Sequence, residues 1–419
     1  MPKDTWYRMD NVAKVFLASY NKRDTRSFRV SCTLKDEIEP ELLTIAVQQA
    51  AKERPQYQVT IRRGLFWHYM EESQAEPEAL EESSRPCPSL YGPSFKGRLH
   101  YQVSFYYDRI NLDMFHALCD GNGGLEFLNI IVINYLKLRY PGKLNDVVVG
   151  TGASMAHLEE DSFKQFYEKE GGVIPKSTAR KKAYHIKGLK LPYDQLQFFE
   201  VHMPADRLLS LARENGASLT SYLGARLMQA VYDDMPFIQR NKPVTLSMPV
   251  NLRNFYPSFT SRNFFNSVYV SHVFKGKEEL SELSREFDRK LKEELAPEVI
   301  GKRMNNYEKI ENLLFVRMVP LALKNPVVNL FNKREEKGIT AVISNLGRLS
   351  VQEALKPYIE TYACFCSTNK LFLTCSSYEN DFVIGISSVY RNTGVLKSFL
   401  SGLAKDGVAV TLYSTEVLA

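Results

Sequence analysis

The sequence predicts an α/β protein of two lobes, each built on a mixed β-sheet flanked by helices. First, 419 residues exceed what one hydrophobic core usually holds. Second, segments of helical and of strand-like periodicity alternate in both halves of the chain. Third, the stretch from Lys176 to Lys190 holds six basic residues and no acidic one, with weak periodicity on either side. We place the crossover there and predict lobes over residues 1–185 and 186–419.

The first half opens with an amphipathic helix and ends with a long one. Leu42, Leu43, Ala46 and Ala50 recur at helical spacing and stop before Pro55, which predicts a helix over residues 39–53. After this helix we predict strands at 57–62 and 64–70, an acidic solvated loop or sheet edge at 71–82, alternating strands at 98–107 and 109–119, and a helix that runs from the glycine-rich turn at 121–124 to just before Pro141.

The second half is helical at first and strand-rich toward its end. Ser218 or Thr220 is expected to cap a helix over 219–232, because a side-chain oxygen there satisfies a free backbone N–H. The predicted elements are a strand at 197–203, a helix from Ala205, the capped helix, a strand at 244–250, an irregular segment at 251–263, a strand at 266–274, a helix at 277–295, helical segments between 303 and 333, and strands at 339–344, 361–367, 370–376, 382–388 and 408–413.

Composition and charge exclude several classes of protein. A net charge of +6, from 54 basic and 48 acidic residues, is far from the clustered basic surface that nucleic-acid binding needs. The six cysteines form no CxxC pair and the histidines are scattered, so we expect neither a metal site nor disulfides, and a cytoplasmic location. The N-terminus lacks a signal-peptide pattern, and charges and prolines interrupt the most apolar later stretch, so no transmembrane helix is expected.

The most informative local feature is the HxxxDG motif His116-Ala117-Leu118-Cys119-Asp120-Gly121, where a strand is expected to end and a glycine-rich turn to begin. A histidine that titrates near neutrality can take a proton from a hydroxyl or amine. The structural alternative is a partly buried histidine followed by an ordinary Asp-Gly turn. A Cys119 nucleophile is disfavoured, because positions three apart on a strand point to opposite faces.

Two further segments, together with this motif, carry a family resemblance. One is Pro249-Val250-Asn251-Leu252-Arg253, which continues through Phe255-Tyr256-Pro257-Ser258 to Arg262-Asn263-Phe264; the other is Ile343-Ser344-Asn345-Leu346-Gly347. In order and separation, the three resemble the coenzyme-A-dependent acyltransferases that share the chloramphenicol acetyltransferase fold, and most of all their alcohol-acetyltransferase-like branch. The resemblance spans nearly the whole chain.

The resemblance implies an active-site tunnel between the two lobes, with His116 near its middle as general base. Gly121 completes the motif, and Asp120 is implied to be a structural partner that forms a salt bridge with Arg253. For the oxyanion, Ser344 and Asn345 are candidate donors, although a strand followed by an ordinary polar turn fits these residues as well. Phe115 and Asn266 are candidates for the tunnel wall. Core packing is the alternative for Phe115 and for the other aromatic residues near these motifs.

The implied reaction moves an acyl group, acetyl or of short to medium length, from acyl-CoA as co-substrate to a hydroxyl of a moderately hydrophobic small molecule or lipid, with no bound cofactor. Many condensation and wax-ester members carry a second histidine before the motif, where this chain has Phe115. The DFGWG element of plant-type members is also absent. The alternatives are an amine acceptor, an acyl donor bound to a carrier protein, and a non-catalytic ligand-binding member of the same fold. The basic stretch after residue 175 is either a solvated linker or a contact for coenzyme A phosphates.

Overall fold

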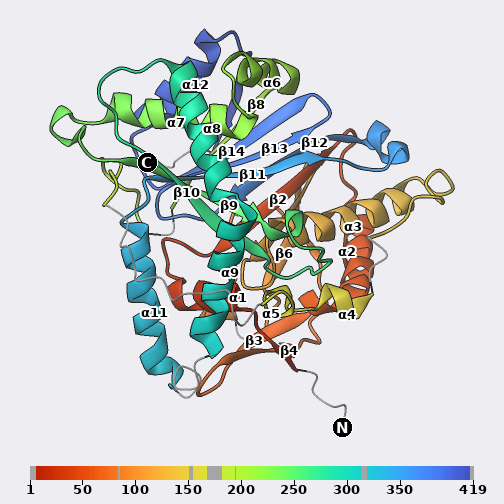
Figure 1. Ribbon diagram of the computed structural model, residues 1–419. Coiled ribbons are helices and arrows are strands. Elements are labelled where there is room, and N and C mark those ends of the chain that lie inside the picture. Colours follow the sequence, from red (N-terminus) through yellow and green to blue (C-terminus); the bar gives the residue numbers. More distant parts are fainter. Residues whose placement is uncertain are drawn as a thin grey trace.

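The structure is a computed structural model that describes residues 6–83, 85–95, 97–150, 154–167, 182–193, 195–312 and 319–415. Two mixed β-sheets form its two halves, and helices pack against both (Figure 1). The core divides in the same way, because one cluster of buried apolar side chains surrounds each sheet. The first half also holds a separate three-stranded antiparallel sheet near the N-terminus. The predicted α/β class and two-lobed architecture are confirmed.

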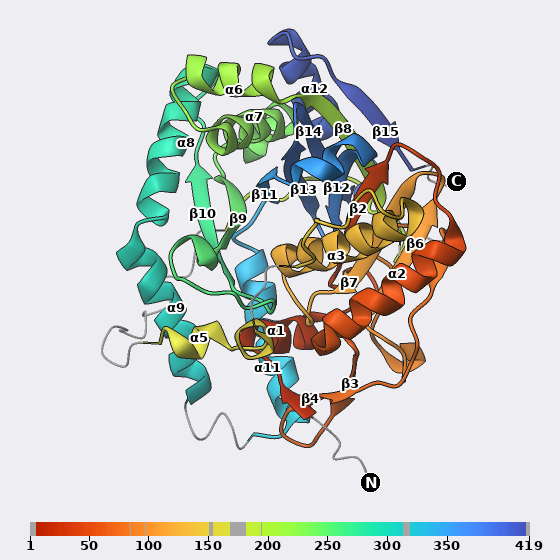
Figure 2. The same ribbon diagram turned by 90° about the vertical axis from the view of Figure 1, so that its right-hand side faces the viewer.

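The first half contains, in chain order, β1 (Trp6–Arg8), α1 (Asn11–Ser19), β2 (Ser27–Leu34), α2 (Pro40–Glu53), β3 (Val59–Arg63), β4 (His68–Glu72), β5 (Ala79–Glu81), β6 (Tyr101–Tyr106), β7 (Arg109–Phe115), α3 (Gly121–Arg139), α4 (Met155–Leu158) and α5 (Ser162–Gln165). Helix α3 packs against β2 and β7, and α2 lies beside α3 (Figure 2). Asp120 caps α3, because its Oδ1 accepts a hydrogen bond from Gly123 N at 3.1 Å. Basic Lys137 and Arg139 complement the other end of this helix dipole.

The second half contains β8 (Gln197–Pro204), α6 (Ala205–Glu214), α7 (Leu219–Asp234), β9 (Val244–Asn251), β10 (Phe265–His272), α8 (Leu280–Glu294), α9 (Pro297–Asn312), α11 (Leu321–Glu336), β11 (Ala341–Leu349), β12 (Ile359–Cys366), β13 (Leu371–Tyr378), β14 (Asp381–Ser388), α12 (Gly394–Lys405) and β15 (Thr411–Ser414). Its sheet has seven strands in the order β10-β9-β11-β13-β14-β8-β15. Of the two predicted caps for α7, Ser218 is the one that accepts a hydrogen bond, from Ser221 N.

One strand of the second half joins the sheet of the first. The five-stranded sheet has the order β12-β2-β7-β6-β5, so β12 pairs with β2 although more than three hundred residues separate them. The chain then crosses through residues 367–370 into β13 of the seven-stranded sheet. The division at residue 185 stays a prediction. Strand β12 lies after that residue in the sequence but belongs to the sheet of the first half. Local periodicity could not reveal the exchange, because it identifies a strand but not its partner.

The acidic and basic stretches are only partly as the sequence analysis expected. Ala79–Glu81 forms an edge strand, as one interpretation of the acidic run allowed. Glu82, however, forms an ion pair with Arg29, whose side chain is buried between Glu82 and Asp113. The first three basic residues of the expected crossover, Lys176, Arg180 and Lys181, lie outside the described residues.

A network of charged side chains connects the two sheets and so fixes the space between them. Arg109 of β7 donates to both carboxylate oxygens of Glu200 on β8, at 2.6 and 2.8 Å. His202 bonds to Glu200 and to Asp381, both at 2.9 Å, and Thr361 of β12 donates to Asp381 at 2.6 Å. Burial alone would lower the pKa of His202, but its two carboxylate partners outweigh burial and raise that pKa to about 9.

This raised pKa predicts that His202 makes the stability of the fold depend on pH. A group whose pKa is higher in the folded state contributes stability that is complete below its unfolded pKa, about 6.5, and is lost as pH rises through about 9. Urea unfolding at pH 6, 7.5 and 9 should show a declining midpoint, and His202→Gln should flatten that decline. The same substitution at the exposed His157 serves as control and should leave the decline intact. A decline unchanged in His202→Gln would contradict the prediction.

Candidate active site

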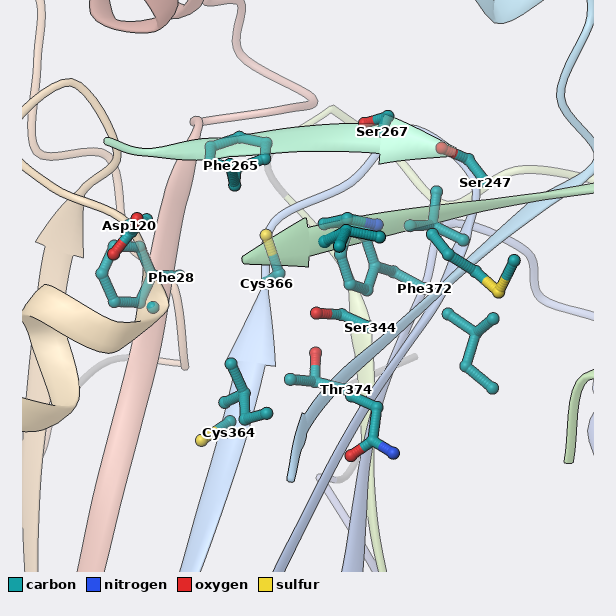
Figure 3. Close-up of a pocket in the computed structure, with 18 of the residues that line it drawn as sticks. Phe28, Asp120, Ser247, Phe265, Ser267, Ser344, Cys364, Cys366, Phe372 and Thr374 are labelled. Atoms are coloured by element: carbon teal, nitrogen blue, oxygen red, sulfur yellow. The ribbon is translucent and has the colours of Figure 1, made fainter. Parts of the chain in front are cut away.

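A cavity of about 730 Å³ lies between the two sheets, and both halves of the chain line it (Figure 3). The first half contributes Phe16, Phe28, Val30, His116, Asp120 and Gly121, among others. The second half contributes residues of β9, β10, β11, β12 and β13, together with the crossing segment 367–370. Of the basic stretch, Lys182, Lys187 and Lys190 are described, and none of them is among the lining residues.

The HxxxDG motif forms a tight turn between β7 and α3. The strand expected to reach Cys119 ends at Phe115, because Leu118 N donates to Phe115 O at 2.9 Å and turns the chain. His116 N donates instead to Arg26 O at 2.8 Å, which ties the turn to the start of β2. The turn leaves His116 on the cavity wall and buries Cys119, where burial raises the pKa of the thiol well above its usual value.

Aromatic side chains surround the imidazole of His116. Its ring stacks on Phe16 with the centroids 4.4 Å apart and lies 4.9 Å from the ring of Phe28. Burial lowers the pKa of His116, and the Asp120 charge and the hydrogen bond to Asn263 offset the effect only in part. The lowered pKa favours the neutral form of the imidazole, which is the form that can accept a proton.

Two residues to which the sequence analysis assigned no role orient this imidazole. His116 Nδ1 lies 3.3 Å from Asn263 Oδ1. The amide of Asn263 is itself oriented, since its Nδ2 donates to His116 O at 3.0 Å and to Asp10 Oδ2 at 3.3 Å. With Oδ1 facing the ring, Nδ1 carries the hydrogen and Nε2 keeps the lone pair.

Asp10 is anchored in turn at the start of α1. Its Oδ1 accepts a hydrogen bond from Ala13 N at 2.7 Å, and burial raises the pKa of Asp10 to about 6. The sequence does carry a signal for this cap, because an aspartate directly precedes the apolar pattern of residues 11–19. Asn263 lies in the irregular segment after β9, and no periodicity indicates that it would reach His116.

The expected ion pair between Asp120 and Arg253 is present. Arg253 Nη1 donates to Asp120 Oδ2 at 2.7 Å, and the same oxygen accepts from Phe264 N at 2.9 Å. The other guanidinium nitrogens of Arg253 donate to the carbonyl oxygens of Thr260 and Arg262. Asp120 thus joins the motif turn to residues 251–264 of the second half. Its side chain is 4% exposed, and both of its oxygens accept hydrogen bonds from within the fold.

Close packing at the start of α3 depends more on the following glycines than on Gly121. A Cβ on Gly121 would lie 3.1 Å from Leu346, a side chain that can shift. A Cβ on Gly123 would lie 2.3 Å from Ser261 O, and one on Gly124 would lie 2.5 Å from the ring of Phe28. Phe28 contacts the His116 ring, so the small residue at 124 lets β2 bring Phe28 against the site.

Strand β11 positions the two oxyanion candidates differently. The strand expected to end at Ser344 continues to Leu349, with a register shift between Asn345 and Arg348. Ser344 lines the cavity and pairs in register with Thr374 of β13, whose buried Oγ1 has no hydrogen-bond partner among the described residues (Figure 3). The Asn345 side chain is engaged elsewhere, because it donates to Thr220 at 2.8 Å and accepts from Gly347 N.

The two residues expected in the tunnel wall do not line the cavity. Phe115 is fully buried in the core of the first half, where its ring stacks on Tyr91 at a centroid distance of 4.9 Å. Asn266 is buried on β10 between Phe265 and Ser267, which do line the cavity. Since side chains alternate along a strand, the prediction selected the wrong face of β10 by one residue.

The described part of the chain holds neither a membrane-spanning helix nor a cluster of metal-ligating side chains. No helix there is long and apolar enough to cross a membrane. No group of three or more His, Cys, Asp and Glu side chains comes together there in a way that could hold a metal ion.

Solved structures share this fold over almost the entire chain. Polyketide synthase associated protein 5 from Mycobacterium tuberculosis superposes with a TM-score of 0.65 at 14% identity, over 97% of this chain and 98% of that one. TRI101 of F. graminearum, complexed with coenzyme A and deoxynivalenol, superposes with a TM-score of 0.63 at 10% identity, over 96% of this chain and 97% of that one. The epimerization domain from the third module of tyrocidine synthetase B superposes with a TM-score of 0.60 at 12% identity, over 96% of each chain.

No protein-family model and no curated protein sequence matches the chain. At identities this low, structural similarity shows the fold alone. The chain has the two-lobed, chloramphenicol-acetyltransferase-like fold that its motifs predicted.

Proposed function

We propose that this protein is an acyltransferase that moves an acyl group, acetyl or of short to medium length, from acyl-CoA to a hydroxyl of a moderately hydrophobic small molecule or lipid. The observation that carries the proposal is a histidine on the wall of a cavity between two lobes, oriented by Asn263, with a pKa that burial lowers. The hydroxyl oxygen attacks the thioester carbonyl, a C–O bond forms, and the C–S bond breaks. The proton passes from the hydroxyl to His116 and then to the departing thiolate.

His116 is the proposed general base because both of its required properties have a structural cause. Asn263 accepts the Nδ1 hydrogen, so Nε2 is available to take the proton from the hydroxyl of the acyl acceptor. Burial lowers the pKa of the ring, which favours the neutral form that a general base requires. A direct transfer without an acyl-enzyme intermediate fits these surroundings, since burial raises the pKa of the Cys119 thiol in the motif turn and of the Cys364 and Cys366 thiols on the cavity wall.

For the oxyanion of the tetrahedral intermediate, we propose Ser344 with the support of Thr374. Both line the cavity on neighbouring strands, and Thr374 presents a buried hydroxyl with no hydrogen-bond partner among the described residues. An unpartnered buried donor is costly to maintain, and a developing negative charge would satisfy it. Asn345 is a weaker candidate, because its side chain already bonds to Thr220 and to Gly347 N.

The lining favours an acceptor with a substantial apolar part. Aromatic rings of Phe16, Phe28, Phe265 and Phe372 face the cavity, together with aliphatic side chains such as Val30. Pockets of several hundred Å³ with apolar walls and few polar groups are typical of small-molecule sites. Coenzyme A complexes of TRI101, which has the same fold, support acyl-CoA as the donor.

The test is release of coenzyme A from acetyl-CoA and longer acyl-CoAs, detected with a thiol reagent, with and without a panel of alcohols and amines. Release that requires an alcohol supports the proposal, and release that requires an amine would replace it with N-acyl transfer. If no acyl-CoA is consumed, the melting temperature separates the two remaining outcomes. A rise with acyl-CoA indicates a ligand-binding protein, because binding stabilises the native state, and no rise indicates a carrier-protein donor.

A further inference from the structure

An exposed apolar surface lies along one side of helix α11 and the tip of the β3–β4 hairpin. Its large apolar side chains are each more than half exposed: Leu65 (68%), Trp67 (55%), Leu323 (65%), Val327 (54%), Leu330 (62%) and Phe331 (62%). We call these six residues the α11–hairpin face. Single exposed apolar residues are common, but a contiguous group of this size marks an interaction site.

The four helical members form one stripe. Positions 323, 327, 330 and 331 follow the spacing i, i+4, i+7 and i+8, which places them on one side of an α-helix. Helix α11 packs against α1, and its partly buried positions, such as Val328 and Asn332, lie outside the stripe, so the helix is held to the protein without using it. The stripe is therefore not required to attach α11 to the fold.

The hairpin tip is fixed beside the beginning of α11. Leu321 N donates to Leu65 O at 2.9 Å, and Lys324 Nζ donates to Phe66 O at 3.2 Å. Figures 1 and 2 agree in showing the β3–β4 connection at the end of α11 where the helix begins. Leu65 and Trp67 consequently extend the stripe beyond the helix, and the six side chains form one surface built from two segments far apart in the sequence.

Basic residues stand at both ends of this surface. Arg62 and Arg63 are exposed next to the hairpin tip, and Lys333, Arg334 and Lys337 are exposed at the other end of α11. Of the nearby acids, Glu71 pairs with Arg62, Glu336 turns toward Arg26 in the cavity, and Glu335 is exposed beside Arg334, so basic residues still outnumber acidic ones at that end of α11. An apolar stripe of Leu, Phe and Trp with Lys and Arg beside it is typical of segments that lie in the interface of an anionic membrane.

We propose that the α11–hairpin face docks on an anionic phospholipid bilayer. The apolar side chains enter the boundary between head groups and acyl chains, and the basic residues contact the lipid phosphates. Docking also deepens the proposed function, because Glu336 at the end of α11 and Ile339 just beyond it line the cavity. A docked molecule therefore presents its cavity near the membrane, where a hydrophobic acceptor is concentrated. The docking itself requires no catalysis.

The experiment measures binding of the full chain to sedimented phosphatidylcholine vesicles with and without phosphatidylserine. We expect binding only to the vesicles with phosphatidylserine, weakened by salt. Leu330→Ser combined with Phe331→Ser should reduce the partition coefficient about tenfold or more, because two apolar anchors are lost. The matched control is Phe237→Ser with Ile238→Ser, which removes side chains that are even more exposed (88% and 85%) between α7 and β9.

Fluorescence gives a second readout that reports position. The chain has two tryptophans, so a Trp6→Phe background leaves Trp67 as the sole indole. Its emission should shift to shorter wavelength when anionic vesicles are added, and the shift should disappear in the Leu330→Ser/Phe331→Ser variant.

Three results would overturn the proposal. The first is equal vesicle binding by the wild type and by the Leu330→Ser/Phe331→Ser variant. The second is equal loss of binding in the control variant. The third is a wild type that is a dimer in sedimentation equilibrium while the Leu330→Ser/Phe331→Ser variant is a monomer. That result would assign the face to a second copy of the chain. Because vesicle binding is measured without turnover, failure of the docking proposal leaves the proposed acyl transfer untouched, and the reverse also holds.

Discussion

Replacing His116 by alanine should lower kcat/KM for acyl transfer about 10²- to 10⁴-fold, the usual contribution of a positioned general base. The expected cause is loss of the neutral Nε2 that accepts the proton of the acceptor, while Asn263 and Phe16 remain to shape the site. Coenzyme A release under conditions of low acceptor concentration measures the effect. Cys119→Ala is the matched control within the same turn and should keep most of the activity, because that thiol is buried.

The pH profile provides a readout that loss of folding would not imitate. The base must be neutral, and burial lowers the pKa of His116 below its usual value of about 6.5. The acid limb of kcat/KM should therefore lie below pH 6.5, and activity should persist where an exposed histidine would already be charged. Wild-type activity retained in His116→Ala, or an acid limb above pH 6.5, would contradict the role assigned to this residue.

Breaking the pair of Asp120 and Arg253 should destabilise the fold as well as abolish activity. Removal of one partner from a largely buried pair costs about 3–5 kcal/mol, because the other charge is left uncompensated. Asp120 also caps α3 and accepts from Phe264 N, so Asp120→Ala removes the helix cap and the two contacts that hold the motif turn to the second half. Urea unfolding of Asp120→Ala and of Arg253→Ala, alongside their coenzyme A release, measures both effects.

A surface ion pair gives the control for this experiment. Arg289 and Glu293 lie one helical turn apart, with side chains 60% and 61% exposed, and Arg289→Ala should cost less than about 1 kcal/mol. If Asp120→Ala kept full stability while losing activity, the structural role would be wrong and a direct role in the reaction would follow. Equal costs for Arg253→Ala and Arg289→Ala would also argue against a structural role for the buried pair.

The site could be predicted in part because some of its components are local. The motif turn joins residues that are close in sequence, and Asp120 and Gly121 stand four and five positions after His116. The partner Arg253 followed only from the family resemblance, and the structure places it at 2.7 Å from Asp120. Asn263 and Asp10 were not assigned, although they orient His116, because the three lie on segments that no periodicity connects.

By itself, the sequence determined the fold class, the position and type of most helices and strands, and the motif at which chemistry is expected. These properties follow from periodicity, caps and turn residues, which act over a few neighbouring positions. The tertiary structure alone decided that β12 crosses into the first sheet, that Ser344 lies beside Thr374, and that Phe115 and Asn266 face away from the cavity. Each of these depends on strand pairing between distant segments, where a shift of one residue exchanges the two faces of a strand.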